Sequence, residues 1–212
     1  MNMKNPDYLT QDSLQNHLYA VQNFGICVGV DEAGRGPLVG PVVAAAVILP
    51  ENFDLPFLND SKKISEKKRE VLFPLIQAQA LAYGIGEASA QEIDEINILN
   101  ATFLAMRRAL EQIQLNYNHV FVDGNHKIRL FDLAMQTPII QGDSLMPSIA
   151  AASILAKVTR DHALEKLDLE FPAYNWKQNK GYGTAAHVQI IRELGPTIHH
   201  RKSFKVKGLS DA

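Results

Sequence analysis

One uninterrupted apolar stretch, residues 42–49, has the length of a buried β-strand and constrains the fold more than any other feature. Residues 26–31 form another apolar run, and a glycine-rich break at residues 33–37 separates the two. Two strand-like runs joined by such a break predict a hairpin. No apolar stretch reaches the roughly 18 residues of a membrane-spanning helix, so we expect no membrane association.

After this hairpin the sequence alternates between helical and strand patterns. Ser65, Ser89 and Thr184 are placed to cap helices, although Pro74 is expected to kink or shorten the helix after Ser65. Such alternation predicts an α/β sheet domain with a helical C-terminal portion. The expected helices cover residues 7–22, 65–79, 89–114, 148–169 and 184–194, and the remaining strands cover residues 81–87, 120–123 and 138–141.

The chain has 212 residues, which fits one large domain. We predict a single catalytic domain over residues 1–212, with a core over about 26–170 and a basic, substrate-binding portion over about 171–212. The net charge is −2 overall, but it is −7 over residues 1–171 and +5 over residues 172–212. Charge alone favours a solvated end for this basic segment, and a polyanion-binding surface is the alternative.

The single cysteine, Cys27, lies within an apolar run, which fits a reducing compartment. Residues 1–12 lack a basic segment followed by an apolar one, so no secretion signal is expected. The sequence therefore predicts a cytoplasmic protein.

Acidic residues close three of the strand-like runs. Asp31, Asp123 and Asp143 each end such a run, and Glu32 follows Asp31 directly. Strand ends collect ligand sites in α/β sheets, and clustered carboxylates require a shared proton or a divalent cation such as Mg²⁺ or Mn²⁺. Adjacent strand residues point to opposite faces, so Asp31 and Glu32 reach one site only if the strand stops or bulges near Gly34. For any single aspartate, turn formation is the alternative.

The turn at Gly34, Arg35 and Gly36 lacks the spacing of a dinucleotide fingerprint or a P-loop. Glycines permit close backbone approach, so amides here could bind a sugar hydroxyl or a phosphate, unless the segment is only a tight turn. Basic side chains elsewhere are candidates for backbone phosphates, or are simply solvated: Lys62, Lys157, Lys180 and Arg201.

These residues stand in a pattern that resembles bacterial ribonuclease HII, the type 2 ribonuclease H. The longest match is residues 29–42, which include the acidic pair and the glycine turn. Matching segments cover the chain from about residue 26 to 204 in the family's order. After residues 29–42 they are residues 60–63, 122–124, 142–143, 148–161, 180–184 and 199–204.

The resemblance implies a ribonuclease H-like fold, with a central mixed β-sheet flanked by helices and a helical C-terminal portion. It implies an endoribonuclease that hydrolyses the RNA strand of RNA–DNA hybrids and cuts at single ribonucleotides in duplex DNA. Asp31, Glu32, Asp123 and Asp143 would hold two divalent ions, Mn²⁺ or Mg²⁺, for a displacement that leaves 5′-phosphate and 3′-hydroxyl ends.

The resemblance also implies substrate contacts. The turn at Gly34, Arg35 and Gly36 would contact the ribonucleotide 2′-hydroxyl, and Tyr182 would pack on the sugar, although a loop tyrosine can instead fill the edge of a core. Ser148 joins the four basic residues above as a further expected substrate contact. The expected partners are RNA–DNA hybrid and ribonucleotide-containing duplex DNA, with the protein acting as a monomer and contact with a replication clamp left open.

The sequence is also compatible with different activities. Ribonuclease HIII has a similar core behind a substrate-binding domain, but only about 25 residues precede the first strand here. The chain could instead be a DNA-directed nuclease of the ribonuclease H-like fold or a non-catalytic nucleic-acid-binding module. In the aromatic segment, Tyr174 and Trp176 fit either base stacking or core packing. Asp161 is expected to pair with Arg160 or another helix neighbour.

Overall fold

The computed structural model describes residues 10–205, in which a five-stranded sheet has the order β3-β2-β1-β4-β5. β1 pairs with β2 in an antiparallel hairpin, with Gly29 opposite Val47, and with β4 in parallel. β3 is antiparallel to β2, and β5 is parallel to β4, so the sheet is mixed. The strands are β1 (Cys27–Ala33), β2 (Val42–Ile48), β3 (Ala82–Ala88), β4 (His119–Asp123) and β5 (Gln136–Ile139).

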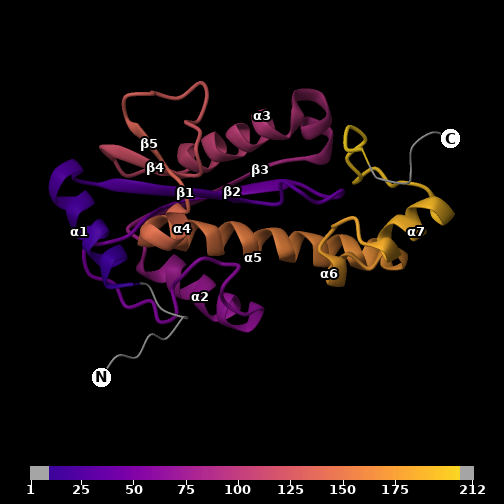
Figure 1. The fold of residues 1–212 in the computed structure, drawn as a ribbon, viewed down its shortest axis with the longest axis horizontal. Helices are drawn as coiled ribbons and strands as arrows, with labels where there is room; N and C mark the ends of the chain where they lie inside the picture. The colour runs from indigo at the N-terminus through magenta and orange to yellow at the C-terminus, as the bar shows by residue number, and fades with distance from the viewer. Residues whose placement is uncertain (1–9, 206–212) are drawn as a thin grey trace.

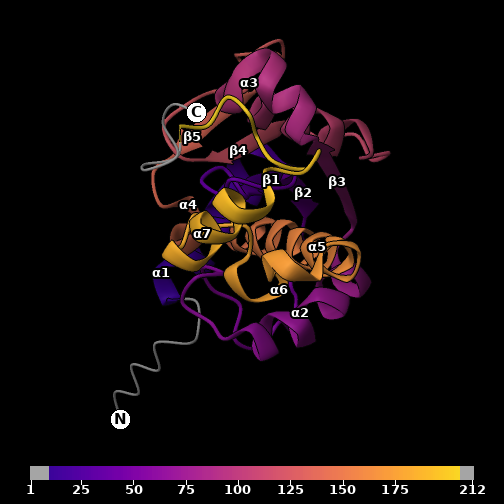
Figure 2. The same ribbon diagram turned by 90° about the vertical axis from the view of Figure 1, so that its right-hand side faces the viewer.

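Helices cover both faces of this sheet. α3 packs against β2 and β3 on one face, and α5 packs against β1 and β2 on the other, with α2 outside α5 (Figures 1 and 2). α6 and α7 lie at the C-terminal end of α5 (Figure 1). The helices are α1 (Gln11–Phe24), α2 (Glu66–Gln79), α3 (Ala90–Glu111), α4 (Gly142–Leu145), α5 (Pro147–Glu170), α6 (Trp176–Asn179) and α7 (Ala185–Leu194), with a 3₁₀ turn at Pro172–Tyr174.

Side-chain caps explain where several helices begin. Ser65, Ser89 and Thr184 accept backbone hydrogen bonds at the starts of α2, α3 and α7, as predicted, and Ser89 forms a full capping box with Glu92. Pro74 lies inside α2 without ending it. The start predicted for the first helix, at residue 7, lies outside the described residues, as do residues 206–212 of the basic segment.

The core has one layer on each side of the sheet. Every residue of β2 is buried, and alternate residues face the α3 layer or the α5 layer, as strand geometry requires. On the α5 side the helix contributes four alanines together with Ile154, Leu155 and Val158, and a Cβ on Gly29 would collide with the backbone of Ser148. α5 therefore lies very close to β1. Among residues 10–205, no helix is long and apolar enough to cross a membrane.

Two local features were not predicted. α3 breaks at Asn97, whose φ is 65° and whose side chain accepts hydrogen bonds from the amides of Leu99 and Asn100, so it caps the second half of the helix. The strand expected over residues 138–141 ends earlier, as β5 at Ile139, and the short helix α4 begins at Gly142.

Candidate active site

Three aspartates from separate elements converge on one point. Asp31 lies on β1, Asp123 is the last residue of β4, and Asp143 lies in α4. One carboxylate oxygen from each lies within 4.8 Å of the other two. Val30 is opposite Val122 in the parallel ladder, so Asp31 and Asp123 follow at neighbouring positions of adjacent strands. The predicted convergence is thus found for these three acids.

The placement of two of these acids differs from the prediction. Asp31 does not end its strand, because pairing with β2 keeps β1 extended through Glu32 to Ala33. Asp143 is not at a strand end either, since β5 stops at Ile139 and the chain turns into α4. It is β4 that ends at the site, and its last residue, Asp123, lies beside Asp31 of β1.

Glu32 lies beside the three-aspartate cluster and is not part of it. Its carboxylate accepts a hydrogen bond from Arg35 at 3.2 Å. Burial raises the pKa of Glu32, and the charge of Arg35 opposes that rise. β1 continues to Ala33, so the break near Gly34 follows Glu32, and Glu32 still lies close enough to Asp31 for its charge to raise the pKa of that carboxyl.

Backbone amides hold two of the carboxylates in place. The amide of Gly142 donates to Asp123 at 2.7 Å, which ties α4 to the end of β4. The amide of Glu32 donates to Asp31 at 2.6 Å. These bonds orient the carboxylates but leave most of their oxygen lone pairs free for a cation.

The cluster is electrostatically strained without a cation. Burial raises the pKa of Asp31, and the charges of Glu32 and Asp123 raise it further. Burial, with Asp60 and Asp123 beside it, raises the pKa of Asp143 to about 6. Like charges in a buried site favour protonation or a bound divalent ion, and an all-oxygen donor set suits Mg²⁺ or Mn²⁺.

Asp60 is a site residue that sequence reasoning missed. Its side chain is nearly buried and shares a hydrogen bond with Asp143. The neighbouring Lys62 is exposed and carries its charge close to the cluster. Partial desolvation disfavours its charge, but Asp143, Asp31 and further carboxylates raise the pKa of Lys62 overall. The match at residues 60–63 was the available signal, but the sequence pattern drew attention only to its lysine.

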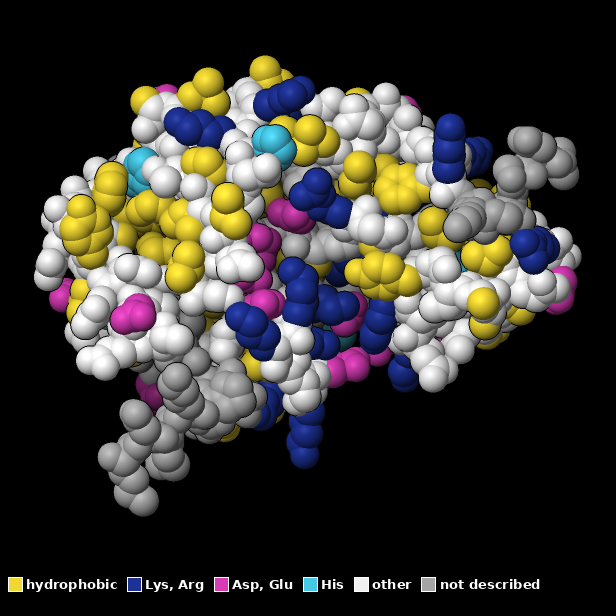
Figure 3. Space-filling view, in the orientation of Figure 1, with side chains coloured by type: hydrophobic (Ala, Val, Ile, Leu, Met, Phe, Trp, Pro, Cys, Tyr) yellow, Lys and Arg dark blue, Asp and Glu magenta, His cyan; other side chains and the backbone are white. Residues whose placement is uncertain are grey.

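Two of the other expected phosphate contacts are engaged in ion pairs. Lys157 lies 2.7 Å from Asp161, and Lys180 lies 3.2 Å from Glu66. Asp161 thus pairs with a helix neighbour, as expected. On the face shown in Figure 3, Asp and Glu side chains gather at the centre with Lys and Arg side chains directly beside them.

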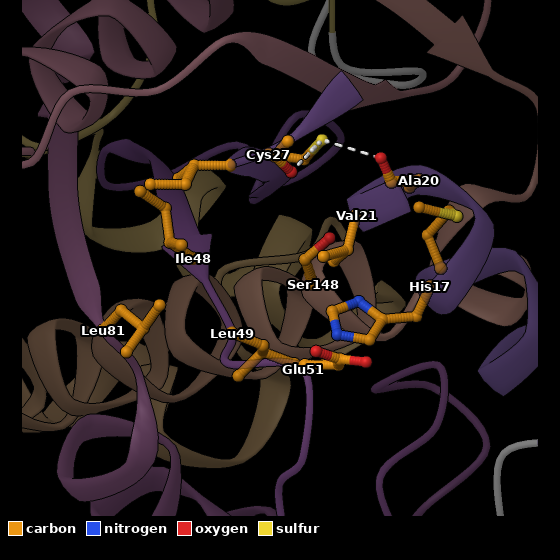
Figure 4. Close-up of a pocket in the computed structure, with 12 residues that line it drawn as sticks. His17, Ala20, Val21, Cys27, Ile48, Leu49, Glu51, Leu81 and Ser148 are labelled. Atoms are coloured by element: carbon orange, nitrogen blue, oxygen red, sulfur yellow. Dashed lines mark hydrogen bonds between the residues drawn. The ribbon is translucent and has the colours of Figure 1, made fainter. Parts of the chain in front are cut away.

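Ser148 and Arg201 are not placed as expected. Ser148 is buried and, with His17 and Cys27, lines a cavity of about 190 Å³ between α1 and the sheet, so it faces no substrate surface (Figure 4). Arg201 is 3% exposed and donates only to backbone carbonyls. Neither side chain is available to a phosphate, because packing of distant segments covers both.

The glycine turn and Tyr182 face each other. A Cβ on Gly36 would lie 3.5 Å from the Tyr182 ring, and that tyrosine is 50% exposed, so it does not fill the edge of a core. Gly34 points inward instead: its φ is +97°, and a Cβ there would collide with Arg160. Tyr174 and Trp176 are buried, which decides in favour of core packing for both.

Comparisons with known proteins agree with this geometry. The family model described as Ribonuclease HII matches residues 28–207. Ribonuclease HII of Syntrophotalea carbinolica is 56% identical over 184 residues, covering 87% of each chain. The enzyme of the same name from Porphyromonas gingivalis is 52% identical over 187 residues, covering 87% of this chain and 90% of the relative.

Solved structures show the same fold. The ribonuclease H2 of Pyrococcus horikoshii OT3 aligns with a TM-score of 0.68 and 24% identity, covering 85% of this chain and 94% of that one. Bst-RNase HIII in complex with Mn²⁺ aligns with a TM-score of 0.65 and 19% identity, covering 83% and 65%. The predicted ribonuclease H-like fold is confirmed. The chain is a ribonuclease H enzyme and belongs to the ribonuclease HII family.

Proposed function

We propose that this enzyme hydrolyses the RNA strand of RNA–DNA hybrids and cuts at single ribonucleotides embedded in duplex DNA. The observation that carries the proposal is a juxtaposition: the three-aspartate cluster begins at Asp31, and the exposed turn at Arg35 and Gly36 follows on the same chain segment. A site for phosphodiester chemistry thus adjoins a backbone segment that can approach a sugar closely. That the protein acts as a cytoplasmic monomer stays a prediction.

The donor set fits two divalent ions, Mg²⁺ or Mn²⁺. Asp31, Asp123 and Asp143 offer oxygen ligands from a buried, mutually repelling cluster, and Glu32 is the fourth proposed ligand. Bst-RNase HIII, which shares the fold, has been solved with Mn²⁺. When bound, such ions supply an activated water and stabilise the leaving 3′-oxygen, so that 5′-phosphate and 3′-hydroxyl ends result.

The protein's own residues orient the substrate around this centre. Lys62 places a positive charge beside the carboxylates, where the scissile phosphate would lie. Lys157 and Lys180 carry positive charge along the adjacent surface and would exchange their carboxylate partners for phosphates. The amides of Arg35 and Gly36 would hydrogen-bond the 2′-hydroxyl, the group that distinguishes RNA from DNA, while the Tyr182 ring packs on the sugar.

The deciding experiment compares two duplexes of one sequence, one all DNA and the other with a single ribonucleotide. With Mg²⁺ or Mn²⁺ we expect cleavage beside the ribonucleotide only, and none with chelator. End-labelled products should carry 5′-phosphate and 3′-hydroxyl groups. Equal cutting of both duplexes would instead identify a DNA-directed nuclease, and binding without cutting would identify a non-catalytic module.

A further inference from the structure

The Arg201 side chain lies in a cage of backbone carbonyls. Its guanidinium makes six hydrogen bonds of 2.7 to 3.1 Å, and these use all five of its N–H donors. The acceptors all belong to residues 34–41, here named the glycine loop. They are the carbonyl oxygens of Gly34, Arg35, Pro37, Gly40 and Pro41.

Burying the Arg201 guanidinium costs desolvation free energy that an apolar core residue would not. No carboxylate of residues 10–205 forms an ion pair with Arg201, so its hydrogen bonds go to backbone carbonyls and only the more distant charge of Asp94 favours the cation. Burial, with Arg160 nearby, lowers the pKa of Arg201 to about 9. An apolar side chain would avoid the cost of burying a charge. What it could not do is fix the direction of several carbonyls at once.

Those directions determine where the amides of the glycine loop point. A trans peptide holds its C=O and N–H on opposite sides, and the described residues contain no cis peptide. The carbonyls of Gly34 and Arg35 point at Arg201, so the amides of Arg35 and Gly36 point away from it, on exposed residues. Neither amide has a hydrogen-bond partner among residues 10–205.

The next amides of the loop behave differently. Leu38 donates to the carbonyl of Gly181 at 2.8 Å, and Gly40 donates to that of His199 at 3.0 Å. The glycine loop therefore presents the backbone N–H groups of Arg35 and Gly36 to solvent, while the amides of Leu38 and Gly40 fix the rest of the loop by hydrogen bonds. The Tyr182 ring lies beside them, next to Gly36.

Arg201 is itself held by a segment we name the strap, residues 199–204. The Asp94 carboxylate on α3 accepts from the amides of Lys202 and Ser203 at 2.9 and 2.8 Å and from the Ser203 hydroxyl at 2.6 Å. The Phe204 ring packs against the guanidinium, and its centre lies 5.0 Å from Cζ of Arg201. The strap thus connects α3 to the glycine loop through Arg201.

We propose that Arg201 is a positioning residue for ribonucleotide selectivity, because it turns the peptides after Gly34 and Arg35 so that their amides face the 2′-hydroxyl. This inference rests on the proposed function and assigns its selectivity to a side chain that never touches the substrate. Asp94 contributes by fixing the strap from outside the site.

The test measures dissociation constants by fluorescence anisotropy with Ca²⁺ as a non-activating ion, for a duplex with one ribonucleotide and for its all-DNA counterpart. Arg201→Lys keeps the positive charge but loses the planar guanidinium group with its five N–H donors. The selectivity ratio is the dissociation constant of the all-DNA duplex divided by that of the ribonucleotide duplex. We expect Arg201→Lys to lower this ratio by about tenfold, which corresponds to roughly one hydrogen bond. Unfolding of part of the sample would weaken both affinities equally and leave the ratio unchanged. The matched control is Arg108→Lys, which loses the paired guanidinium hydrogen bonds to Glu92 within α3 and should keep the ratio.

Asp94→Asn is the second variant, and it decides the matter if Arg201→Lys does not fold. Asp94 is partly exposed, and we expect the loss of its charge and of one acceptor oxygen to lower the ratio by a few-fold. Asp132→Asn makes the same change at another carboxylate that accepts a local backbone amide, and it should keep the ratio. Wild-type ratios in both Arg201→Lys and Asp94→Asn would overturn the inference while leaving the proposed function intact. If the wild-type enzyme itself cuts both duplexes equally, the proposed function fails first.

Discussion

Two groups of like charges adjoin the glycine loop, and the fold treats them differently. In the first group Asp31, Asp123 and Asp143 repel one another with few hydrogen bonds. In the second group Arg160 and Arg201 are also buried neighbours, but backbone carbonyls accept from both guanidinium groups. A loop can therefore solvate cations permanently with its own carbonyls, whereas the carboxylates keep free lone pairs for an external ion. The acids form a site, and the arginines form a scaffold.

A substitution should have opposite effects on stability in the two groups: losing a carboxylate charge relieves repulsion, whereas losing the guanidinium group leaves backbone carbonyls without their donors. Asp123→Asn should reduce cleavage on the order of a thousandfold, because it removes a proposed metal ligand. The same change relieves repulsion, so we expect the metal-free variant to melt no lower than the wild type, whereas Arg201→Lys melts lower. Single-turnover cleavage and thermal melting with chelator measure both effects. A large fall in melting temperature for Asp123→Asn would contradict the comparison.

The two glycines of the turn have different surroundings: Gly34 packs against the buried Arg160, and Gly36 lies beside the exposed Tyr182 ring. Gly34→Ala places a side chain at positive φ against Arg160, and we expect a loss of about 2 kcal/mol or more in the free energy of unfolding. Gly36→Ala has room beside Tyr182, so it should fold normally and weaken only ribonucleotide cleavage. Urea unfolding and cleavage assays on both variants test this. Equal destabilisation by the two substitutions would show that the turn has no such division.

Tyr182 tests how much of the recognition surface depends on a ring. Tyr182→Ala should weaken binding of the ribonucleotide duplex by about 1–3 kcal/mol if the ring packs on the sugar. Tyr182→Phe keeps the ring and should stay close to the wild type. Anisotropy titrations of both variants with the ribonucleotide duplex measure these affinities. If the phenylalanine variant loses as much affinity as the alanine variant, the role belongs to the Tyr182 hydroxyl and not to its ring.

The acid cluster, unlike the arginine pair, should respond to pH near neutrality. Because the pKa of Asp143 is raised to about 6, this carboxylate gains a proton as the pH falls through 6 and loses its ability to bind a cation. Mn²⁺ affinity should therefore be constant above about pH 7 and fall by about tenfold per pH unit below 6. Calorimetric titration at pH 7.5, 6.0 and 5.0 measures it. An affinity that stays level down to pH 5 would mean that Asp143 is not a ligand.

Sequence patterns predicted the features that depend on neighbouring residues. The hairpin and the caps at Ser65, Ser89 and Thr184 follow from local spacing. The convergence of Asp31 and Asp123 was expected from the rule that strand ends collect ligand sites, and the pairing of β1 with β4 brings the two residues together. Asn97 escaped prediction because an isolated polar residue in a helical pattern does not reveal that its side chain will restart the helix.

Further features depend on contacts between distant segments. Arg201 was interpreted as a phosphate contact because a sequence shows its charge but not the carbonyl cage formed by residues about 160 positions earlier. Ser148 lies in a matched segment, yet burial against β1 decides its role. Asp60 joins the site through Asp143, from which it is distant in sequence. Such roles become visible only when the fold brings the partners together.

The close packing of α5 against β1 has a consequence for the products of the reaction. Ser153 of this helix bonds Asp31, and Arg160, two turns further on, bonds the carbonyls of Val39 and Pro41. Seven residues of helix span roughly 10 Å and cannot stretch. If the proposed function holds, α5 keeps the reactive centre at a constant distance from the loop that contacts the ribose, so the cut falls at the same position relative to that ribose in every substrate.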